Sequence, residues 1–175
     1  FHTVTPGHCL LSHGLNSRPD ATKVSALART AAQLGWSCER LDYRDLDENG
    51  QPADVERRIQ RLVDATRNVR GPLVLAGSSL GAYISARVSL EVPVLGLFLM
   101  APPIRMGHLA DLDSARVPSS ILHGWDDELI QAQEVSDWAH ARRARLLLVN
   151  DTHRLSDHVE ASAQAFAALL QSLPT

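Results

Sequence analysis

The chain has 175 residues, 45% of them hydrophobic and 21% charged, which is ordinary for a globular protein, and we expect one domain over residues 1–175. The net charge of −3 offers no basic surface for nucleic acid, and no apolar stretch approaches the length that spans a bilayer. We therefore expect neither nucleic acid nor a membrane among the partners of this protein.

The two cysteines, Cys9 and Cys38, lie in separate apolar segments and far from any Cys-x-x-Cys spacing. We expect both to be free buried thiols; because their segments could be neighbours in a sheet, a disulfide between them is the alternative. Sparse cysteine usage favours a reducing, cytoplasmic location. The scattered histidines show no metal-ligand spacing, and we expect neither a metal nor another cofactor.

Short aliphatic runs alternate with amphipathic stretches along the chain, a pattern typical of βαβ units. It predicts a doubly wound α/β fold, with about six mainly parallel strands and helices on both faces of the sheet. The expected strands are His8–Ser12, Ser37–Leu41, Leu73–Ala76, Val94–Met100, Ser119–His123 and Arg145–Val149. Loops and chemistry should gather at the carboxyl ends of these strands.

Three stretches show the apolar spacing of amphipathic helices. The first ends before Gly35, which stands where a helix C-terminal glycine belongs. Ser156 is expected to cap the last helix. After a turn over residues 47–52, the second helix should bury an apolar stripe and expose Glu56, Arg57, Arg58 and Arg61.

The segment 74–83 is an apolar strand that breaks into Gly-Ser-Ser-Leu-Gly and continues as a helix of small residues. This pattern predicts a nucleophile elbow with Ser79 at its tip, because glycines keep Cβ atoms away from the crowded strand-helix crossing. The alternative is a glycine-rich turn used only for close packing. A serine hydroxyl is a poor nucleophile at neutral pH, so the first interpretation also requires a base and a group that orients the base.

Candidates for both groups follow further along the chain. Asp127 lies in the loop after the fifth expected strand and His153 just beyond the sixth, so serine, acid and histidine follow in the order of a triad on such a sheet. Asp126 is the alternative acid, and either aspartate could instead only cap the next helix. His158 is the alternative base, but it should fall in the first turn of the last helix.

A hydrolytic site of this kind also needs two backbone N–H groups that bind the developing oxyanion. We expect them from Leu80, directly after Ser79, and from Leu15, in the loop after the first strand. Asn16 is the alternative for the second donor, because the sequence does not determine the backbone register of this loop. His13 and its neighbour Gly14 could equally form a plain strand-ending turn.

Together these landmarks resemble the α/β-hydrolase superfamily, and the resemblance covers essentially the whole chain. Small bacterial members without a cap carry His-Gly-x-Asn-Ser, Gly-Ser-Ser-Leu-Gly, His-Gly-x-x-Asp-x-x-Ile and Asp-x-x-His-Arg-Leu in this order. The first three stand in this sequence as written, and the last reads Asp-Thr-His-Arg-Leu over residues 151–155. The antiparallel strand pair that usually opens the sheet is missing, and residues 101–118 are too few for a helical cap. The resemblance implies an esterase-like serine hydrolase with an open, shallow site.

We expect hydrolysis of small or short-chain carboxylic esters or thioesters through an acyl-enzyme on Ser79. A catalytically silent module of the same fold, binding a small molecule or a protein partner, is the alternative. The sequence determines neither the natural substrate nor the oligomeric state. Substrate-binding residues are expected at loop starts over the sheet, where they could equally be core residues: Met100, Pro102, Pro103, Leu129 and Ile130.

Overall fold

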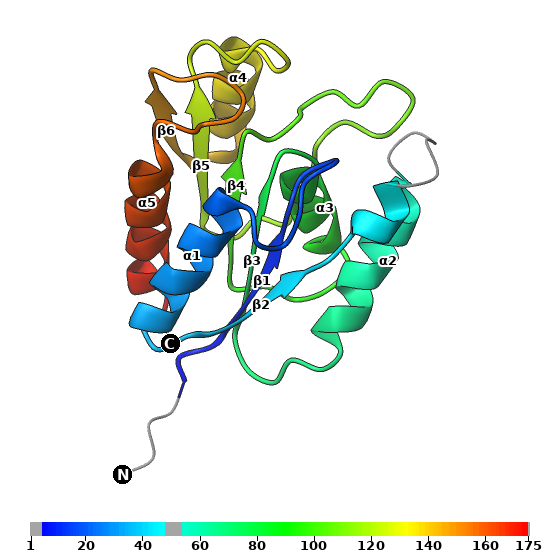
Figure 1. Ribbon diagram of the computed structural model, residues 1–175, viewed down its shortest axis with the longest axis vertical. Coiled ribbons are helices and arrows are strands. Elements are labelled where there is room, and N and C mark those ends of the chain that lie inside the picture. Colours follow the sequence, from blue (N-terminus) through cyan, green and yellow to red (C-terminus); the bar gives the residue numbers. More distant parts are fainter. Residues whose placement is uncertain (1–4, 48–53, 175) are drawn as a thin grey trace.

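Six parallel strands form one sheet in the spatial order β2-β1-β3-β4-β5-β6 (Figure 1). The computed structural model describes residues 5–47 and 54–174. The strands are β1 (His8–Ser12), β2 (Ser37–Leu41), β3 (Leu73–Ser78), β4 (Gly96–Met100), β5 (Ser119–Gly124) and β6 (Arg145–Val149). The parallel pairing confirms the predicted doubly wound α/β sheet without an antiparallel opening pair.

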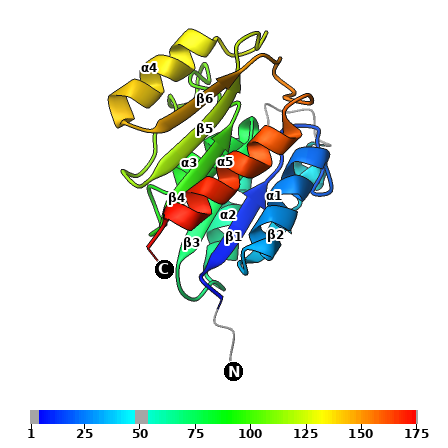
Figure 2. The same ribbon diagram turned by 90° about the vertical axis from the view of Figure 1, so that its left-hand side faces the viewer.

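The helices cover both faces of this sheet (Figure 2). One face carries α1 (Thr22–Gln33) and α5 (Val159–Ser172). The other face carries α2 (Val55–Thr66), α3 (Leu80–Val88) and α4 (Ala132–Arg142). A short 3-10 helix, η1 (Arg44–Asp47), follows β2.

Each face of the sheet has its own apolar layer, because successive strand residues point to opposite faces. Val74 and Phe98 pack under α1 and α5, whereas Leu75 and Leu97 pack under α2, α3 and α4. All six residues of β3 are buried, which explains why the central strands are continuous apolar runs in the sequence. Exposed residues recur along β2 and β6, which lie at the edges of the sheet.

The structure corrects two expectations about the helices. Arg58 is fully buried rather than solvent-facing, because its spacing from Val55 and Leu62 places it within the buried stripe of α2. Ser156 does not cap α5; His158 occupies the position before the helix, and no side chain caps it. Of the predicted turn at residues 47–52, only Asp47 lies within the described residues.

The two cysteines lie side by side in the sheet. Cys9 in β1 and Cys38 in β2 are direct partners in the strand register, and both are free thiols. Cys9 is fully buried and Cys38 half-buried. Burial raises the pKa of both thiols, that of Cys38 to about 11, so both are protonated and unreactive at neutral pH.

Candidate active site

The sheet changes its winding direction at β1, which pairs with β2 on one side and with β3 on the other. The loops after β1 and β3 therefore diverge at the carboxyl edge of the sheet and leave a crevice between them. Residues from the loops after β5 and β6 line the same crevice. Four segments that are far apart in the sequence thus meet at one place.

Ser79 lies in the turn between β3 and α3 with φ 55° and ψ −117°, a backbone conformation that residues other than glycine rarely adopt. Its N–H donates to the carbonyl of Met100 at 2.8 Å, and its own carbonyl accepts the N–H of Ala82 at 2.9 Å. A conformation of this kind costs about 1–3 kcal/mol and persists because the surrounding structure imposes it. The turn thereby places the hydroxyl of Ser79 at the crevice.

The glycines that flank this turn are required by close backbone contacts. A Cβ atom on Gly77 would lie 2.3 Å from the carbonyl of Gly81, and a Cβ atom on Gly81 would lie 2.1 Å from the carbonyl oxygen of Ser12. Both obstacles are backbone atoms, so no change of a side-chain rotamer could relieve them. The strand and the helix can cross this closely only with glycine at both positions.

Ser79, His153 and Asp127 form a chain of hydrogen bonds. The Oγ of Ser79 lies 3.0 Å from Nε2 of His153, and Nδ1 of His153 donates to Oδ2 of Asp127 at 2.7 Å. Because the carboxylate accepts the Nδ1 proton, the lone pair of Nε2 faces the serine hydroxyl. The side chain of Asp127 is fully buried and that of His153 is only 14% exposed, so water competes little for these bonds.

The carboxylate of Asp127 is held at both oxygens. Its Oδ1 accepts the N–H groups of Leu129 and Ile130, each at 2.8 Å. His123, at the end of β5, donates from Nε2 to the carbonyl of Ile130 at 2.9 Å and lies 3.4 Å from Oδ2 of Asp127. Burial lowers the pKa of His123, so this ring is neutral at neutral pH. Sequence reasoning missed this bracing role, which the spacing of four residues to Asp127 signals.

The alternative acid and the alternative base lie elsewhere. The side chain of Asp126 is exposed, and its N–H donates to the carbonyl of Asp151. His158 donates from Nδ1 to Oδ2 of Asp151 at 2.9 Å, and the same oxygen accepts the N–H of Asp157. Asp151 and His158 therefore organise the start of α5 and do not contact Ser79.

Within the described part of the chain, the N–H groups of Leu15 and Leu80 donate to no protein acceptor. Leu80 is the first residue of α3, where a helix leaves its N–H free. The N–H of Asn16 is not free, because it donates to Oδ2 of Asp47 at 3.1 Å. Of the two N–H groups predicted as candidates in the loop after β1, the one without a protein acceptor is thus that of Leu15.

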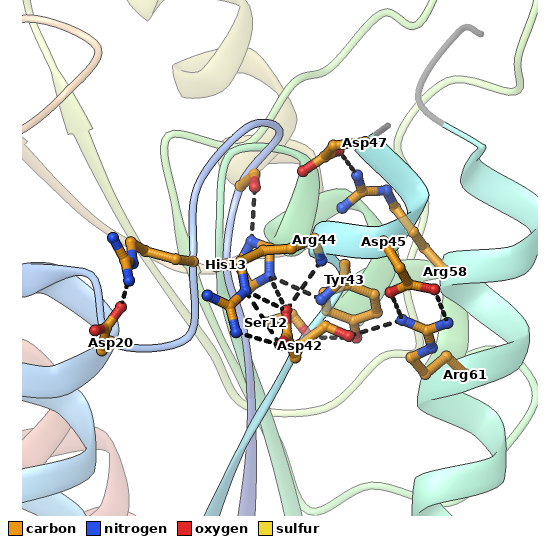
Figure 3. Close-up of polar contacts among 12 residues, drawn as sticks. Ser12, His13, Asp20, Asp42, Tyr43, Arg44, Asp45, Asp47, Arg58 and Arg61 are labelled. Carbon is orange, nitrogen blue, oxygen red and sulfur yellow. Dashed lines mark hydrogen bonds and ion pairs between the residues drawn. The ribbon is translucent and has the colours of Figure 1, made fainter. Parts of the chain in front are cut away.

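A buried polar network holds this loop in place (Figure 3). His13 is only 1% exposed; it donates from Nδ1 to the carbonyl of Gly14 at 2.8 Å and accepts the N–H of Tyr43 at Nε2, at 2.9 Å. Burial lowers the pKa of His13, and these two bonds suit its neutral form. The hydroxyl of Tyr43 lies 2.8 Å from Oγ of Ser12, which joins β1 to the chain after β2.

An ion pair ties the same loop to α2. Asp47, at the end of η1, accepts the N–H of Asn16 and pairs with the guanidinium of Arg58 (Figure 3). The guanidinium lies 5.5 Å from the centre of the Tyr43 ring, where a cation-π contact adds to the pair. Sequence reasoning did not connect Asp47 with the loop and placed Arg58 in solvent, so it missed this link. The position of Arg58 within the apolar stripe of α2 was the available signal.

The crevice is a pocket of about 810 Å³ that contains Ser79 and His153 in its wall. Residues of α1, of the loop after β1 and of the loops after β5 and β6 complete the wall, among them Leu15, Lys23 and Arg154. Residues 101–118 form no helix, as expected for a member without a cap. The pocket is therefore not covered by any element inserted between β4 and β5.

The expected substrate-binding residues are mostly part of the core. Leu129 lines the pocket and is 71% exposed. Met100, Pro102 and Ile130 do not line it: the first two are buried, and Ile130 packs against the apolar layer below α2, α3 and α4. Of the expected substrate-binding residues, Leu129 is thus the one that lies in the wall of this pocket.

Residues 5–47 and 54–174 contain no group of three or more His, Cys, Asp or Glu side chains that could hold a metal ion. None of the helices in this part of the chain is both long and apolar enough to cross a membrane.

Residues 6–172 match the family described as alpha/beta hydrolase domain. A protein of the alpha/beta hydrolase superfamily from Xanthomonas campestris pv. campestris is 59% identical and superposes with a TM-score of 0.93, over 95% of this chain and 99% of that one. A serine hydrolase without a lid from Xanthomonas campestris is 23% identical, with a TM-score of 0.77 over 99% and 85% of the two chains. An esterase from Pyrococcus furiosus is 14% identical, with a TM-score of 0.75 over 97% and 83%. No curated protein sequence matches the chain.

The fold, the sheet edge and the lack of a cap define a hydrolase of the alpha/beta class. With nearly its whole length matched and a relative at 59% identity, the chain belongs to the alpha/beta hydrolase family. The resemblance noted in the sequence is thereby confirmed. The two more distant structures share the fold.

Proposed function

We propose that this hydrolase cleaves small or short-chain carboxylic esters or thioesters, with Ser79 as nucleophile, His153 as base and Asp127 as the group that orients His153. The observation that carries the proposal is the unbroken chain of hydrogen bonds from Asp127 to His153 to Ser79, at 2.7 and 3.0 Å. These distances lie within the reach that proton transfer between nucleophile and base requires.

In the acylation step, Oγ of Ser79 attacks the carbonyl carbon while its proton passes to Nε2 of His153. Asp127 stabilises the imidazolium that forms, and the N–H groups of Leu15 and Leu80 donate to the oxyanion of the tetrahedral intermediate. His153 then gives its proton to the leaving alcohol or thiol, and the acyl group stays on Ser79. The N–H of Asn16 takes no part, because Asp47 accepts it.

In the deacylation step, water attacks the acyl carbonyl and gives a proton to Nε2 of His153. The second tetrahedral intermediate collapses, Ser79 leaves with the proton from His153, and the carboxylic acid is released. The lack of a cap favours small substrates, because no additional element encloses a long acyl chain.

A fluorophosphonate probe tests the nucleophile directly, because it reacts with a serine only when a neighbouring base activates it. We expect labelling of the wild-type protein at Ser79, located by peptide mass mapping, and none in Ser79→Ala. Ser78→Ala is the matched control, since Ser78 precedes the nucleophile at the end of β3 and contributes no hydrogen bond to His153. Labelling then justifies a screen of p-nitrophenyl esters and acyl thioesters.

Two results would contradict the proposal. Folded wild-type protein that stays unlabelled would favour a catalytically silent module that binds a small molecule or a protein. Hydrolysis by Ser79→Ala at the wild-type rate would remove Ser79 from the reaction, because loss of a triad member lowers kcat by several orders of magnitude in other serine hydrolases.

A further inference from the structure

Lys23 is the only lysine in the chain; every other one of the 17 lysine and arginine residues is arginine. It lies in the first turn of α1 and lines the same pocket as Ser79 and His153. Its side chain is half-buried, although lysine is among the residues that are most often fully exposed. The single lysine of the chain thus lines the pocket that contains the proposed nucleophile.

The position of Lys23 is electrostatically unfavourable in the protein by itself. The first turn of a helix carries the positive end of the helix dipole, which favours acidic side chains and disfavours a cation. The first turn of α1 contains no acidic residue, and the residue before it, Ala21, provides no capping side chain. A residue that breaks a local rule without a compensating contact is expected mainly at functional sites.

Within the described residues, Lys23 has neither a hydrogen bond nor an ion pair. The two carboxylates that act electrostatically on Lys23 are engaged elsewhere. Asp127 accepts from His153 and two backbone N–H groups, and Asp151 accepts from His158, Thr152 and Asp157. Burial lowers the pKa of Lys23, with Asp151 acting in the opposite direction and Arg154 in the same direction. The ammonium group is therefore partly desolvated and not paired.

A second cation lies at the same pocket. Arg154 follows His153 directly, is exposed, and has no ion pair within the described part of the chain. Among the described residues, the one acidic side chain in the pocket wall is Glu128, whose Oε2 accepts the N–H of His153 at 3.2 Å. The wall thus offers two cations without partners and one carboxylate that already holds the backbone of the triad histidine.

We propose that the ester or thioester carries an anionic group, a carboxylate or a phosphate, which binds to Lys23 with Arg154 at the rim of the pocket. This proposal rests on the hydrolytic function proposed above and specifies its substrate class. The anion would give Lys23 the partner that the protein lacks, and the free N–H groups at the start of α1 would add to the attraction. Charge-assisted hydrogen bonds of this kind are about twice as strong as neutral ones.

The kinetic test compares matched anionic and neutral esters. In the first pair the charge lies on the acyl half: p-nitrophenyl hydrogen glutarate is the anionic ester and p-nitrophenyl valerate the neutral one. In the second pair the charge lies on the alcohol half: 4-phosphonooxyphenyl valerate is the anionic ester and phenyl valerate the neutral one. We expect Lys23→Met to lower kcat/KM for one of the anionic esters by about 10- to 100-fold and to leave both neutral esters within twofold. Arg29→Met, an exposed cation further along α1, is the control and should change none of them.

A binding experiment separates this proposal from the proposed function. Reductive methylation with ¹³C-formaldehyde labels the amine of Lys23 and the chain terminus, and Lys23→Arg identifies which NMR signal belongs to Lys23. In Ser79→Ala protein, at least one of the two anionic ligands, glutarate monomethyl ester or 4-phosphonooxyphenyl valerate, should shift the Lys23 signal in a saturable manner, whereas methyl valerate should not. The outcome that overturns the proposal is an unchanged ratio of anionic to neutral kcat/KM in Lys23→Met for both pairs, or no saturable shift with either anionic ligand. Absence of all ester hydrolysis together with a saturable shift would reject the hydrolytic mechanism and keep the anion site.

Discussion

At the scale of single residues, the candidate site consists of side chains that are each held in one hydrogen-bonding state. Asp127 uses one oxygen for two backbone N–H groups and the other for His153. His13 and His123 are neutral because burial lowers the pKa of each ring. Such constraints remove alternative tautomers and orientations, so little reorganisation is needed when charge develops during the reaction.

The role of Asp127 can be tested with Asp127→Asn. The amide oxygen can keep both backbone hydrogen bonds, but the amide nitrogen would then face Nδ1 of His153 and force the proton onto Nε2. We expect kcat for an ester substrate to fall by about 10³- to 10⁴-fold with the fold retained. Asp126→Asn, one residue earlier and exposed, should remain near wild type. Activity of Asp127→Asn above a tenth of wild type would assign the orienting role to another group.

At the scale of elements, the loop after β1 is positioned by segments that do not contact the reacting atoms. η1 supplies Asp47, which pairs with Arg58 of α2 and accepts the N–H of Asn16. The chain after β2 supplies Tyr43, which holds His13. The same segments that complete the sheet and its helical layer therefore also determine which N–H group of the loop is free.

Arg58→Met should show how strongly α2 depends on this ion pair. Removal of the cation leaves Asp47, whose side chain is only 10% exposed, without its buried partner, which costs about 3–5 kcal/mol. We expect the free energy of unfolding in urea to fall by this amount. Arg57→Met alters the exposed neighbour and should stay within about 0.5 kcal/mol of wild type. Equal stability of the two variants would contradict a structural role for the buried pair.

At the scale of the whole molecule, one parallel sheet with an apolar layer on each face places all reactive loops at a single edge. The order β2-β1-β3 opens the crevice, and the strands on the other side of β3 bring Asp127 and His153 to it. The glycine contacts between β3 and α3 keep that helix tight against the sheet. Stability of the entire sheet is therefore a condition for the geometry of the site.

The pH dependence of this stability follows from the buried histidines. The folded-state pKa values of His13 and His123 lie below the ordinary value of 6.5, so the unfolded chain binds more protons as pH falls below 6.5. Stability should be complete above pH 6.5 and decrease below it, by up to about 1.4 kcal/mol per pH unit for each ring. Burial raises the pKa of Asp151, but the hydrogen bonds that its carboxylate accepts outweigh this effect, so the pKa is lowered overall. The contribution of Asp151 to the free energy of unfolding is therefore lost only below about pH 4.

Urea unfolding at pH 7.5, 6.5, 5.5 and 4.5 measures this dependence. His123→Gln keeps a donor for the carbonyl of Ile130 but does not titrate, so its stability should decrease less steeply between pH 6.5 and 5.5 than that of the wild type. His140→Gln, an exposed histidine near the end of α4, is the control and should leave the slope unchanged. A wild-type stability that is constant from pH 7.5 to 4.5 would contradict the neutral state of the two buried rings.

Features that depend on neighbouring residues could be predicted from the amino-acid sequence alone. The alternation of apolar runs and amphipathic stretches defined the six strands and the doubly wound fold, because local patterning reflects which faces are buried. The spacing of glycines around Ser79 marked a strand-helix turn that only glycine permits. Strand order and loop position selected Asp127 and His153, which the structure brings within hydrogen-bond distance of each other and of Ser79.

Features that depend on contacts between distant segments became visible only in the folded molecule. Arg58 is buried against Asp47 and Tyr43. The choice of Leu15 over Asn16 as the second oxyanion donor depends on the hydrogen bond from the N–H of Asn16 to Asp47, which lies 31 positions further along the chain. Met100 is part of the apolar core, because the apolar layer below α1 and α5 extends to the carboxyl end of β4. The periodicity of helices and strands in the sequence does not show how far such a layer extends. Burial and hydrogen-bond partners at such positions are properties of the packed molecule, since they arise only when separate elements meet.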